Sequence, residues 1–274
     1  MDQTSFIIHP MKTFRTLYFP FTVFMVGAAI ATTAVGQTPE PSGANGGNQT
    51  TNAAGRGRGG RGGGGGIAGG LTIGKANSLL PVATATAKPD PDGFIQRWLV
   101  LEPIPGDGRV TENAVKATVR REFFPNQLTI LPKDGDKVTS EGQQYAWHAI
   151  DTKLYNVDLR HFAYSLNKSS DNTVIWAVTV IDCPEEMHNV RLAIGSNSAT
   201  VWWVNGQEVT GVYGDIQTTV DDAVSKRLTL KKGPNVIRTV MVNNGGACDF
   251  CARILDEQGN PVKNFTVSLS GPAR

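Results

Sequence analysis

Short runs of β-branched and aromatic residues recur from about Phe94 to Leu269, and they constrain the fold more than any other feature of the sequence. Clusters of Gly, Asn, Asp and Pro separate these runs, which read FIQRWLVL, VIWAVTVI, NVRLAIG, TVWWVNG, KRLTLKKG, NVIRTVMVN, FCARILD and FTVSLS. Strands at this spacing, without intervening helices, are expected to pair antiparallel. The sequence therefore predicts an all-β fold, with two antiparallel sheets forming a sandwich or barrel.

Turn and helix signals refine this prediction. Asn205-Gly206 supplies the two positive-φ residues of a type I′ turn, so TVWWV and QEV are predicted to form a hairpin. A second turn at residues 231–235 joins RLTL to VIRTVMV. Residues 111–121, TENAVKATVRR, are the one segment predicted to form a short helix.

The N-terminal residues have the design of an export signal. Residues 11–15 are basic, residues 17–34 are uncharged and mostly apolar, and Ala34-Val35-Gly36 offers small residues for a signal peptidase. We therefore predict a signal peptide over residues 1–36, cleavage between Gly36 and Gln37, and a secreted or periplasmic protein that has no membrane segment after cleavage.

Two alternatives concern the same segment. An apolar stretch of about 18 residues can nearly span a bilayer, so a membrane anchor competes with a cleaved signal. Pro20, the threonines and the small residues at the end of the stretch favour cleavage. Met11 is an alternative start to Met1, because the first ten residues add nothing to the export signal.

Residues 37–75 are predicted to be a disordered Gly/Arg-rich linker. They hold nearly half of the 31 glycines of the chain and too few apolar residues to offset the entropy of ordering the backbone. The run from Arg56 to Arg61 resembles RGG segments that bind single-stranded nucleic acid. It has only three arginines and no interleaved aromatic residue. We therefore predict a solvated linker, no nucleic-acid partner, and a near-neutral folded domain over residues 76–274.

Several motifs occur in a characteristic order within this domain. FIQRWLVLEPIPG comes first, Gly195-Ser196-Asn197-Ser198 is followed by TVWWVNGQEV, and LTLKKGPNVI and FCARILDEQGN come after it. This order resembles the galactose-binding-like jelly-roll modules, which include the sugar-binding domain of family 2 glycoside hydrolases and non-catalytic modules of secreted bacterial proteins. The resemblance covers roughly residues 94–269. It implies a jelly-roll sandwich and a carbohydrate ligand.

The chain also departs from the pattern of that family. Asn197 and Ser198 stand where relatives often have acidic residues, and Glu102 replaces the usual glycine after the first strand. Cys248 and Cys251 occupy a stretch where relatives commonly have tryptophan or glycine. A binding site used by the relatives is therefore expected to have moved here.

The adjacent residues Trp202 and Trp203 must point to opposite faces of a strand. The family register places Trp202 inward with Thr200 and Val204, and places Trp203 at the rim, beside the solvated position of Val201. An exposed tryptophan could stack on a sugar ring. We therefore assign ligand binding to four residues, Trp203, Asn205, Tyr213 and Asp215. In the alternative interpretation another segment covers Trp203, which then only packs.

A catalytic function has little support in the sequence. No G-x-S-x-G elbow or H-E-x-x-H motif occurs, and paired catalytic carboxylates cannot be recognised from spacing on a sandwich. Trp98, Trp147 and Trp176 are predicted to lie in the core. No cofactor and no metal are predicted.

The three cysteines are predicted to be buried and reduced. Cys248 and Cys251 are three residues apart, which on an extended strand is about 10 Å, beyond the reach of a disulfide. A bridge from Cys183 to one of them is the alternative.

The sequence leaves two functions open. The first is a secreted, non-catalytic carbohydrate-binding or adhesion module, whose partner is a polysaccharide or another glycan. The alternative is an accessory or catalytic component of a glycan-degrading hydrolase or esterase system.

Overall fold

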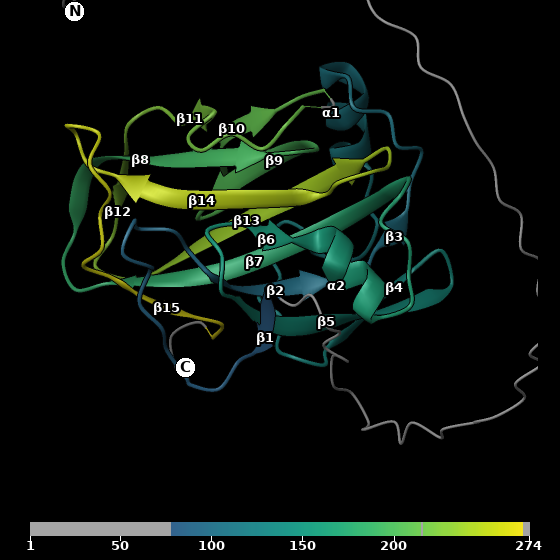
Figure 1. Ribbon diagram of the computed structural model, residues 1–274, viewed down its shortest axis with the longest axis horizontal. Helices are drawn as coiled ribbons and strands as arrows, with labels where there is room; N and C mark the ends of the chain where they lie inside the picture. Colours follow the sequence, from purple (N-terminus) through teal and green to yellow (C-terminus); the bar gives the residue numbers. More distant parts are fainter. Residues whose placement is uncertain (1–77, 215, 271–274) are drawn as a thin grey trace, which may run out of the picture. The chain divides into compact units, whose positions relative to one another are not determined.

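A computed structural model describes residues 78–214 and 216–270, which form two antiparallel β-sheets (Figure 1). The predicted two-sheet antiparallel fold is confirmed. The strands of the first sheet are β1 (Leu79–Pro81), β2 (Arg97–Leu101), β3 (Ile104–Pro105), β4 (Lys137–Ser140), β5 (Gln143–Thr152), β7 (Thr173–Cys183), β9 (Ala199–Val204), β10 (Gln207–Val212), β13 (Gly233–Asn243) and β15 (Thr266–Ser268). Their main order is β1-β5-β2-β7-β13-β9-β10, with β3 and β15 paired to β7 and β4 paired to β5.

The second sheet is smaller and follows the order β11-β8-β14-β6, with β12 also paired to β8. Its strands are β6 (Val157–Asp158), β8 (Met187–Ser196), β11 (Ala223–Val224), β12 (Leu228–Leu230) and β14 (Asp249–Leu255). Two helices complete the described elements, α1 (Glu112–Arg120) and α2 (Leu159–Ser165). The long strands of both sheets run in similar directions in Figure 1.

The space between the two sheets is filled by one apolar cluster, here called the inter-sheet core. Trp98 and Phe250 pack edge to face there at 5.0 Å between ring centroids, and Trp202 packs edge-on against both rings. Burial of these large aromatic side chains stabilises the packing of the two sheets against each other.

The opposite face of the first sheet carries a second apolar cluster, here called the outer-face core. Trp147, Trp176 and Trp203 belong to it. It is covered by Val115 and Val119 of α1 and by Phe123 and Phe124 of the following segment. The central strands of the first sheet are therefore buried on both faces, which explains why VIWAVTVI is apolar at consecutive positions rather than at alternate ones.

The local sequence signals are largely confirmed. Asn205 and Gly206 have φ values of 51° and 84° and join β9 to β10 as a two-residue turn. Gly233, with a φ of 82°, lies in the predicted turn between β12 and β13. The predicted helix over 111–121 is α1, and Trp98, Trp147 and Trp176 are buried.

The second helix, α2, was not predicted. It is only seven residues long, and the Asp158 side chain caps it by accepting a hydrogen bond from the backbone N–H of His161 at 2.8 Å. Leu159 and Phe162 anchor it in the inter-sheet core. Tertiary burial, rather than a long apolar period, therefore maintains this helix.

All three cysteines are free and buried, as predicted. Desolvation by burial raises the pKa of Cys183 to about 11 and the pKa of both Cys248 and Cys251 to about 12. The thiols are therefore uncharged at neutral pH and behave as small apolar side chains.

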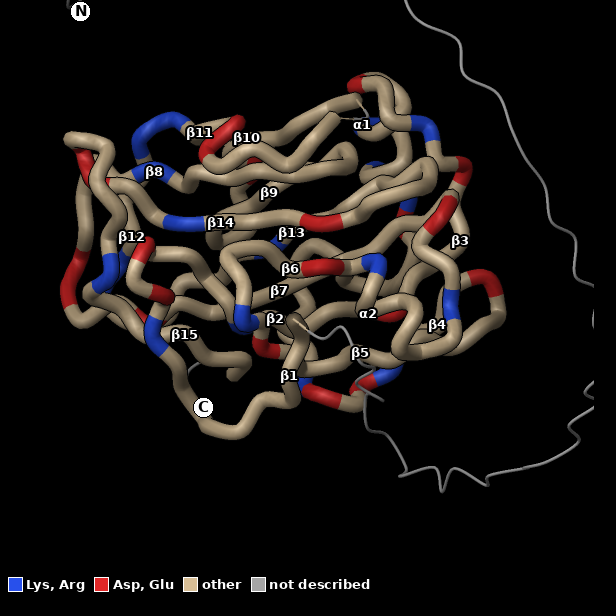
Figure 2. Tube along the Cα trace, viewed as in Figure 1, with Lys and Arg blue, Asp and Glu red and all other residues tan. Residues whose placement is uncertain are grey.

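The predicted signal peptide (1–36) and linker (37–75) lie outside the described residues. Among residues 78–214 and 216–270, no helix is long and apolar enough to span a membrane. Figure 2 shows Lys and Arg interspersed with Asp and Glu along the trace.

Candidate functional site

Trp203 does not lie at the rim of the sandwich, so this prediction was wrong. It is 5% exposed, and its ring stacks on that of Trp176, with 5.9 Å between centroids and 24° between planes. Val201, predicted at a solvated position, is 1% exposed. Both residues face the outer-face core, where α1 and the segment after it exclude water. The alternative interpretation, in which Trp203 is covered and packs, is confirmed.

The other predicted ligand-binding residues do not come together. The Asn205 side chain donates to Asn235 Oδ1 at 2.9 Å and accepts from the Val236 N–H at 2.9 Å, so it holds the hairpin turn. Tyr213 is half-buried under Lys116, whose Nζ lies 5.7 Å from the ring centroid. The six-residue strand β10 separates Asn205 from Tyr213 by roughly 20 Å. Asp215 lies outside the described residues.

A groove of about 400 Å³ does lie beside the hairpin. Asn205 lines it together with Gln207, Glu208 and Arg227, and no aromatic side chain contributes to its lining. The groove offers hydrogen-bonding groups but no ring face for stacking.

A second pocket combines hydrogen-bonding groups with apolar side chains. It measures about 300 Å³ and is lined by residues of β3, the start of β5 and the loop after α2. Of its apolar residues, Pro105 is exposed, whereas Pro103 is buried and Tyr145 is 5% exposed. Lys168 and Asp171 are the charged groups of its lining. We call it the Tyr145 pocket. Its volume is at the small end of the range for small-molecule sites.

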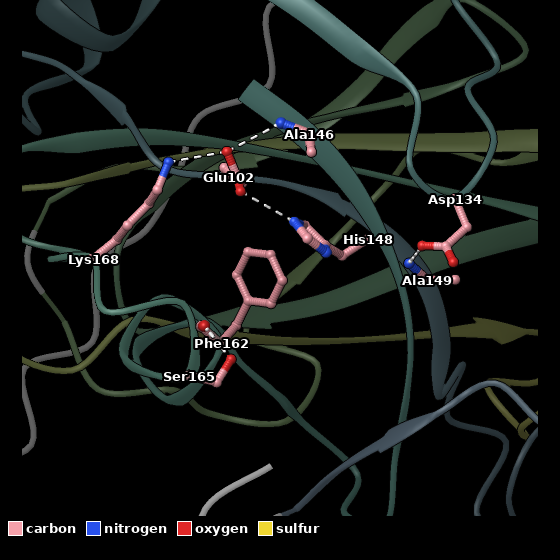
Figure 3. A network of polar contacts seen from close by, with 8 residues as sticks. All are labelled: Glu102, Asp134, Ala146, His148, Ala149, Phe162, Ser165 and Lys168. Atoms are coloured by element: carbon pink, nitrogen blue, oxygen red, sulfur yellow. Dashed lines mark hydrogen bonds and ion pairs between the residues drawn. The ribbon is translucent and has the colours of Figure 1, made fainter. Parts of the chain in front are cut away.

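Lys168 of this pocket belongs to a network of polar contacts (Figure 3). One oxygen of Glu102, Oε2, accepts from Lys168 Nζ at 2.9 Å and from the Ala146 N–H at 3.1 Å. The other oxygen, Oε1, lies 3.2 Å from Nε2 of His148, whose ring packs edge-on against Phe162 at 5.7 Å. Lys168 Nζ also lies 5.2 Å from the centroid of the Tyr145 ring. The ammonium is therefore fixed at the wall of the pocket.

The carboxyl of Glu102 is held ionised by this network. Desolvation by burial raises its pKa, but hydrogen bonds from Lys168, the Ala146 N–H and His148, together with the charge of Lys168, lower the pKa below its usual value. A general acid needs a raised pKa instead. Glu102 is therefore suited to position Lys168 and not to donate a proton.

Local backbone structure presents Lys168 to the pocket. The Asn167 and Lys168 N–H groups donate to the carbonyls of Tyr164 and Ala163 at the end of α2, at 3.0 and 2.9 Å. Asn167 has a φ of 56°, the left-handed conformation that ends a helix. The chain therefore turns at Asn167 and carries Lys168 across to Glu102.

Asp171 also lines the Tyr145 pocket. Its N–H donates to Ser169 Oγ at 2.9 Å, and its Oδ1 accepts from the Gly246 N–H at 3.2 Å. Its second oxygen, Oδ2, has no hydrogen-bond partner among the described residues. This pocket therefore offers one fixed cation and one carboxylate oxygen that can accept from a hydroxyl.

Glu102 departs from the pattern of the galactose-binding-like modules, but no sequence signal connects it with His148 or Lys168. These partners lie 46 and 66 positions away along the chain, and no spacing motif joins them. Within the described ranges, no group of three or more His, Cys, Asp or Glu residues could hold a metal ion.

No protein-family model and no curated protein matches the chain. Among solved structures, it is similar to a PA14 sugar-binding domain from an RTX adhesin, with 13% identity, a TM-score of 0.39, and coverage of 62% of this chain and 96% of that one. The PA14 domain of the MpAFP antifreeze protein gives 14% identity, a TM-score of 0.37, and coverage of 70% and 100%. These values are too low to assign the chain to a family.

Proposed function

We propose that the chain is a secreted, non-catalytic carbohydrate-binding or adhesion module that binds a glycan in the Tyr145 pocket. In this proposal residues 1–36 are a cleaved signal peptide, residues 37–75 are a linker, and residues 76–274 form a jelly-roll sandwich. A mature N-terminus at Gln37, measured by intact mass on exported protein, tests the export part. Retention of Met1 or Met11 would refute it.

The observation that carries the proposal is the pairing of apolar surfaces with fixed polar groups in one pocket. Sugar rings present C–H faces that pack on aromatic and proline surfaces, while their hydroxyl groups need donors and acceptors at set positions. Pro105 supplies an exposed apolar surface, and Tyr145, which is 5% exposed, supplies only a small part of its side chain. Lys168 supplies donors beyond the one that it gives to Glu102, and Asp171 supplies an acceptor.

Preorganisation supports the same proposal. The Glu102 carboxylate holds the Lys168 ammonium at 2.9 Å before any ligand arrives. The entropy of fixing a long lysine side chain is therefore spent in folding and not in binding. The ammonium is also neutralised by Glu102, so the pocket does not select for an anionic ligand by charge alone.

A catalytic or accessory component of a glycan-degrading system is the second candidate. Asp249 favours it, because desolvation by burial raises the pKa of this carboxyl, as a general acid requires. However, both of its oxygens already accept hydrogen bonds, from Thr218 Oγ1 and Asn156 Nδ2. This saturation favours a structural role, and the binding module remains our first proposal.

A glycan array probed with the full chain tests the proposal, followed by titration of each glycan that binds. Lys168→Ala should weaken binding about tenfold or more, since a hydrogen bond to a charged group contributes roughly 1.5–3 kcal/mol. Lys116→Ala is the matched control, because Lys116 also pairs with a carboxylate, Glu112, and lies over a tyrosine ring. Product release from the array glycans would instead support the second candidate.

A further inference from the structure

The loop between β5 and β6 exposes two large apolar side chains next to each other. Leu154 is 50% exposed and Tyr155 is 41% exposed. Among the described residues, Tyr164 on α2 is the other aromatic side chain with comparable exposure, at 49%. Isolated exposed apolar residues are ordinary, so Tyr155 needs further evidence before it indicates a site.

The ring of Tyr155 is supported from behind by a chain of contacts. It packs on the ring of Phe94, with 5.4 Å between centroids and 57° between planes. The guanidinium of Arg253 lies 4.8 Å from the centroid of Phe94, and its Nε donates to Asp221 Oδ1 at 2.9 Å. The exposed ring is therefore backed by a buried ring, a cation and a carboxylate in succession. Such support holds a ring in one orientation.

Fixed polar groups lie beside the same ring. Asn156, the next residue, donates from Nδ2 to Asp249 Oδ2 at 2.8 Å, and Thr218 Oγ1 donates to the other oxygen of Asp249. Desolvation by burial is the largest cause that raises the pKa of the Tyr155 phenol, and the charge of the nearby Asp249 carboxylate raises it further. Asp249 and Arg253 thus bridge the loop of Tyr155 to the loop that contains Thr218 and Asp221.

We propose that Tyr155, with Asn156 beside it and Phe94 and Arg253 behind it, forms a second glycan-binding site, at which a pyranose ring stacks on the Tyr155 ring. We call it the Tyr155 platform. Its position is separate from the Tyr145 pocket, because β5 begins at Gln143 beside that pocket and ends three residues before Tyr155, about 30 Å away along the strand. The inference rests on the proposed carbohydrate-binding function.

A sugar fits this platform better than a protein surface does. A stable protein interface buries roughly 800 Å² on each partner, and a single ring with one neighbouring leucine is far smaller. One exposed ring, with the Asn156 amide on the next residue, matches the size of one pyranose unit. Two such contacts on one domain would also raise the affinity for a long polysaccharide over that for a short one.

Affinity electrophoresis of the full chain in gels that contain galactomannan, xyloglucan, xylan or hyaluronan tests the inference. Tyr155→Ala should weaken retention by about three- to tenfold, the range expected when one aromatic stacking contact is lost. Tyr155→Phe keeps the ring and should retain wild-type mobility. Tyr164→Ala, which removes an equally exposed tyrosine that lies under Arg160, is the matched control and should change nothing.

The outcomes separate this inference from the proposed function. Retention of wild type and Tyr155→Ala to the same degree, with loss in Lys168→Ala, overturns the Tyr155 platform alone. Weaker retention of Tyr155→Ala, with wild-type retention of Lys168→Ala, overturns the Tyr145 pocket and leaves the platform. If none of the four polysaccharides retains the wild-type protein, both proposals fail.

Discussion

Trp202 and Trp203 are adjacent in β9, yet they point into two different cores. Trp202 is fully buried between the sheets, and Trp203 is 5% exposed beneath α1 and the segment that follows it. Opposite orientation follows from strand geometry, whereas burial of both faces requires a layer on each side of the first sheet. The first sheet is therefore the middle layer of this domain.

Both tryptophans are consequently expected to stabilise the fold to a similar degree. Trp202→Ala and Trp203→Ala should each lower the free energy of unfolding by about 3–5 kcal/mol, because each leaves a large cavity. Urea denaturation of the two variants measures this, with Tyr164→Ala as the exposed control. A Trp203→Ala variant as stable as this control would show that the outer face is not covered.

Two buried arginines on the first sheet are predicted to behave in opposite ways. Arg97 is 2% exposed and bonds Asp151 at 2.7 Å, whereas Arg238 is 3% exposed and donates to the backbone carbonyl of Ile130, with its Nη1 unpaired. Desolvation lowers the pKa of Arg238 to about 10. Arg97→Met should cost about 3 kcal/mol, because it strands a partly buried carboxylate.

Arg238→Met should instead be neutral or stabilise the protein by about 1 kcal/mol, because it removes an unpaired buried charge. Urea denaturation at neutral pH compares the two variants. Equal destabilisation by both would mean that Arg238 has an anionic partner that the described contacts do not include.

The raised thiol pKa values predict that the cysteines do not react in the native protein. At pH 8, iodoacetamide should leave Cys183, Cys248 and Cys251 unmodified, since almost no thiolate exists and the side chains are buried. Denaturation before labelling should give three adducts by intact mass. Native labelling, or a Cys248–Cys251 disulfide found by peptide mapping, would contradict the extended backbone at this position.

Ionisation of Glu102 is predicted to make the free energy of unfolding depend on pH. Its pKa is lower in the folded protein than the ordinary value of 4.5. The ionised carboxylate therefore stabilises the fold at pH values above 4.5, and this stabilisation is lost as the pH falls through the pKa of the folded state. Glu102→Gln should therefore lose less stability than wild type between about pH 5 and 3. Denaturation at several pH values tests this, and parallel curves for the two proteins would exclude a stabilising role for the carboxylate.

Local sequence signals predicted the features that depend on neighbouring residues. The Asn205-Gly206 turn, the helix over residues 111–121 and the opposite orientation of the two tryptophans all follow from a few adjacent side chains. The covering of Trp203 does not, because the family register placed it at a rim and the covering layer comes from a distant part of the chain. VWWV is apolar at all four positions, which is itself typical of a strand buried on both faces.

The candidate site was the least predictable part. Glu102, His148 and Lys168 come from three separate segments that only the sheet and the end of α2 bring together. Charged residues of loops carry no periodicity, so nothing local distinguishes Lys168 from a solvated lysine. The sequence drew attention to Glu102 only as a departure from a family pattern.

The central claim, that the Tyr145 pocket binds a glycan, is tested most directly by calorimetric titration of an array-positive glycan into wild type, Lys168→Ala and Lys116→Ala. The account predicts an affinity about tenfold or more lower for Lys168→Ala and an unchanged affinity for Lys116→Ala. Equal affinities for all three proteins would contradict the account, and so would an equal loss in both variants.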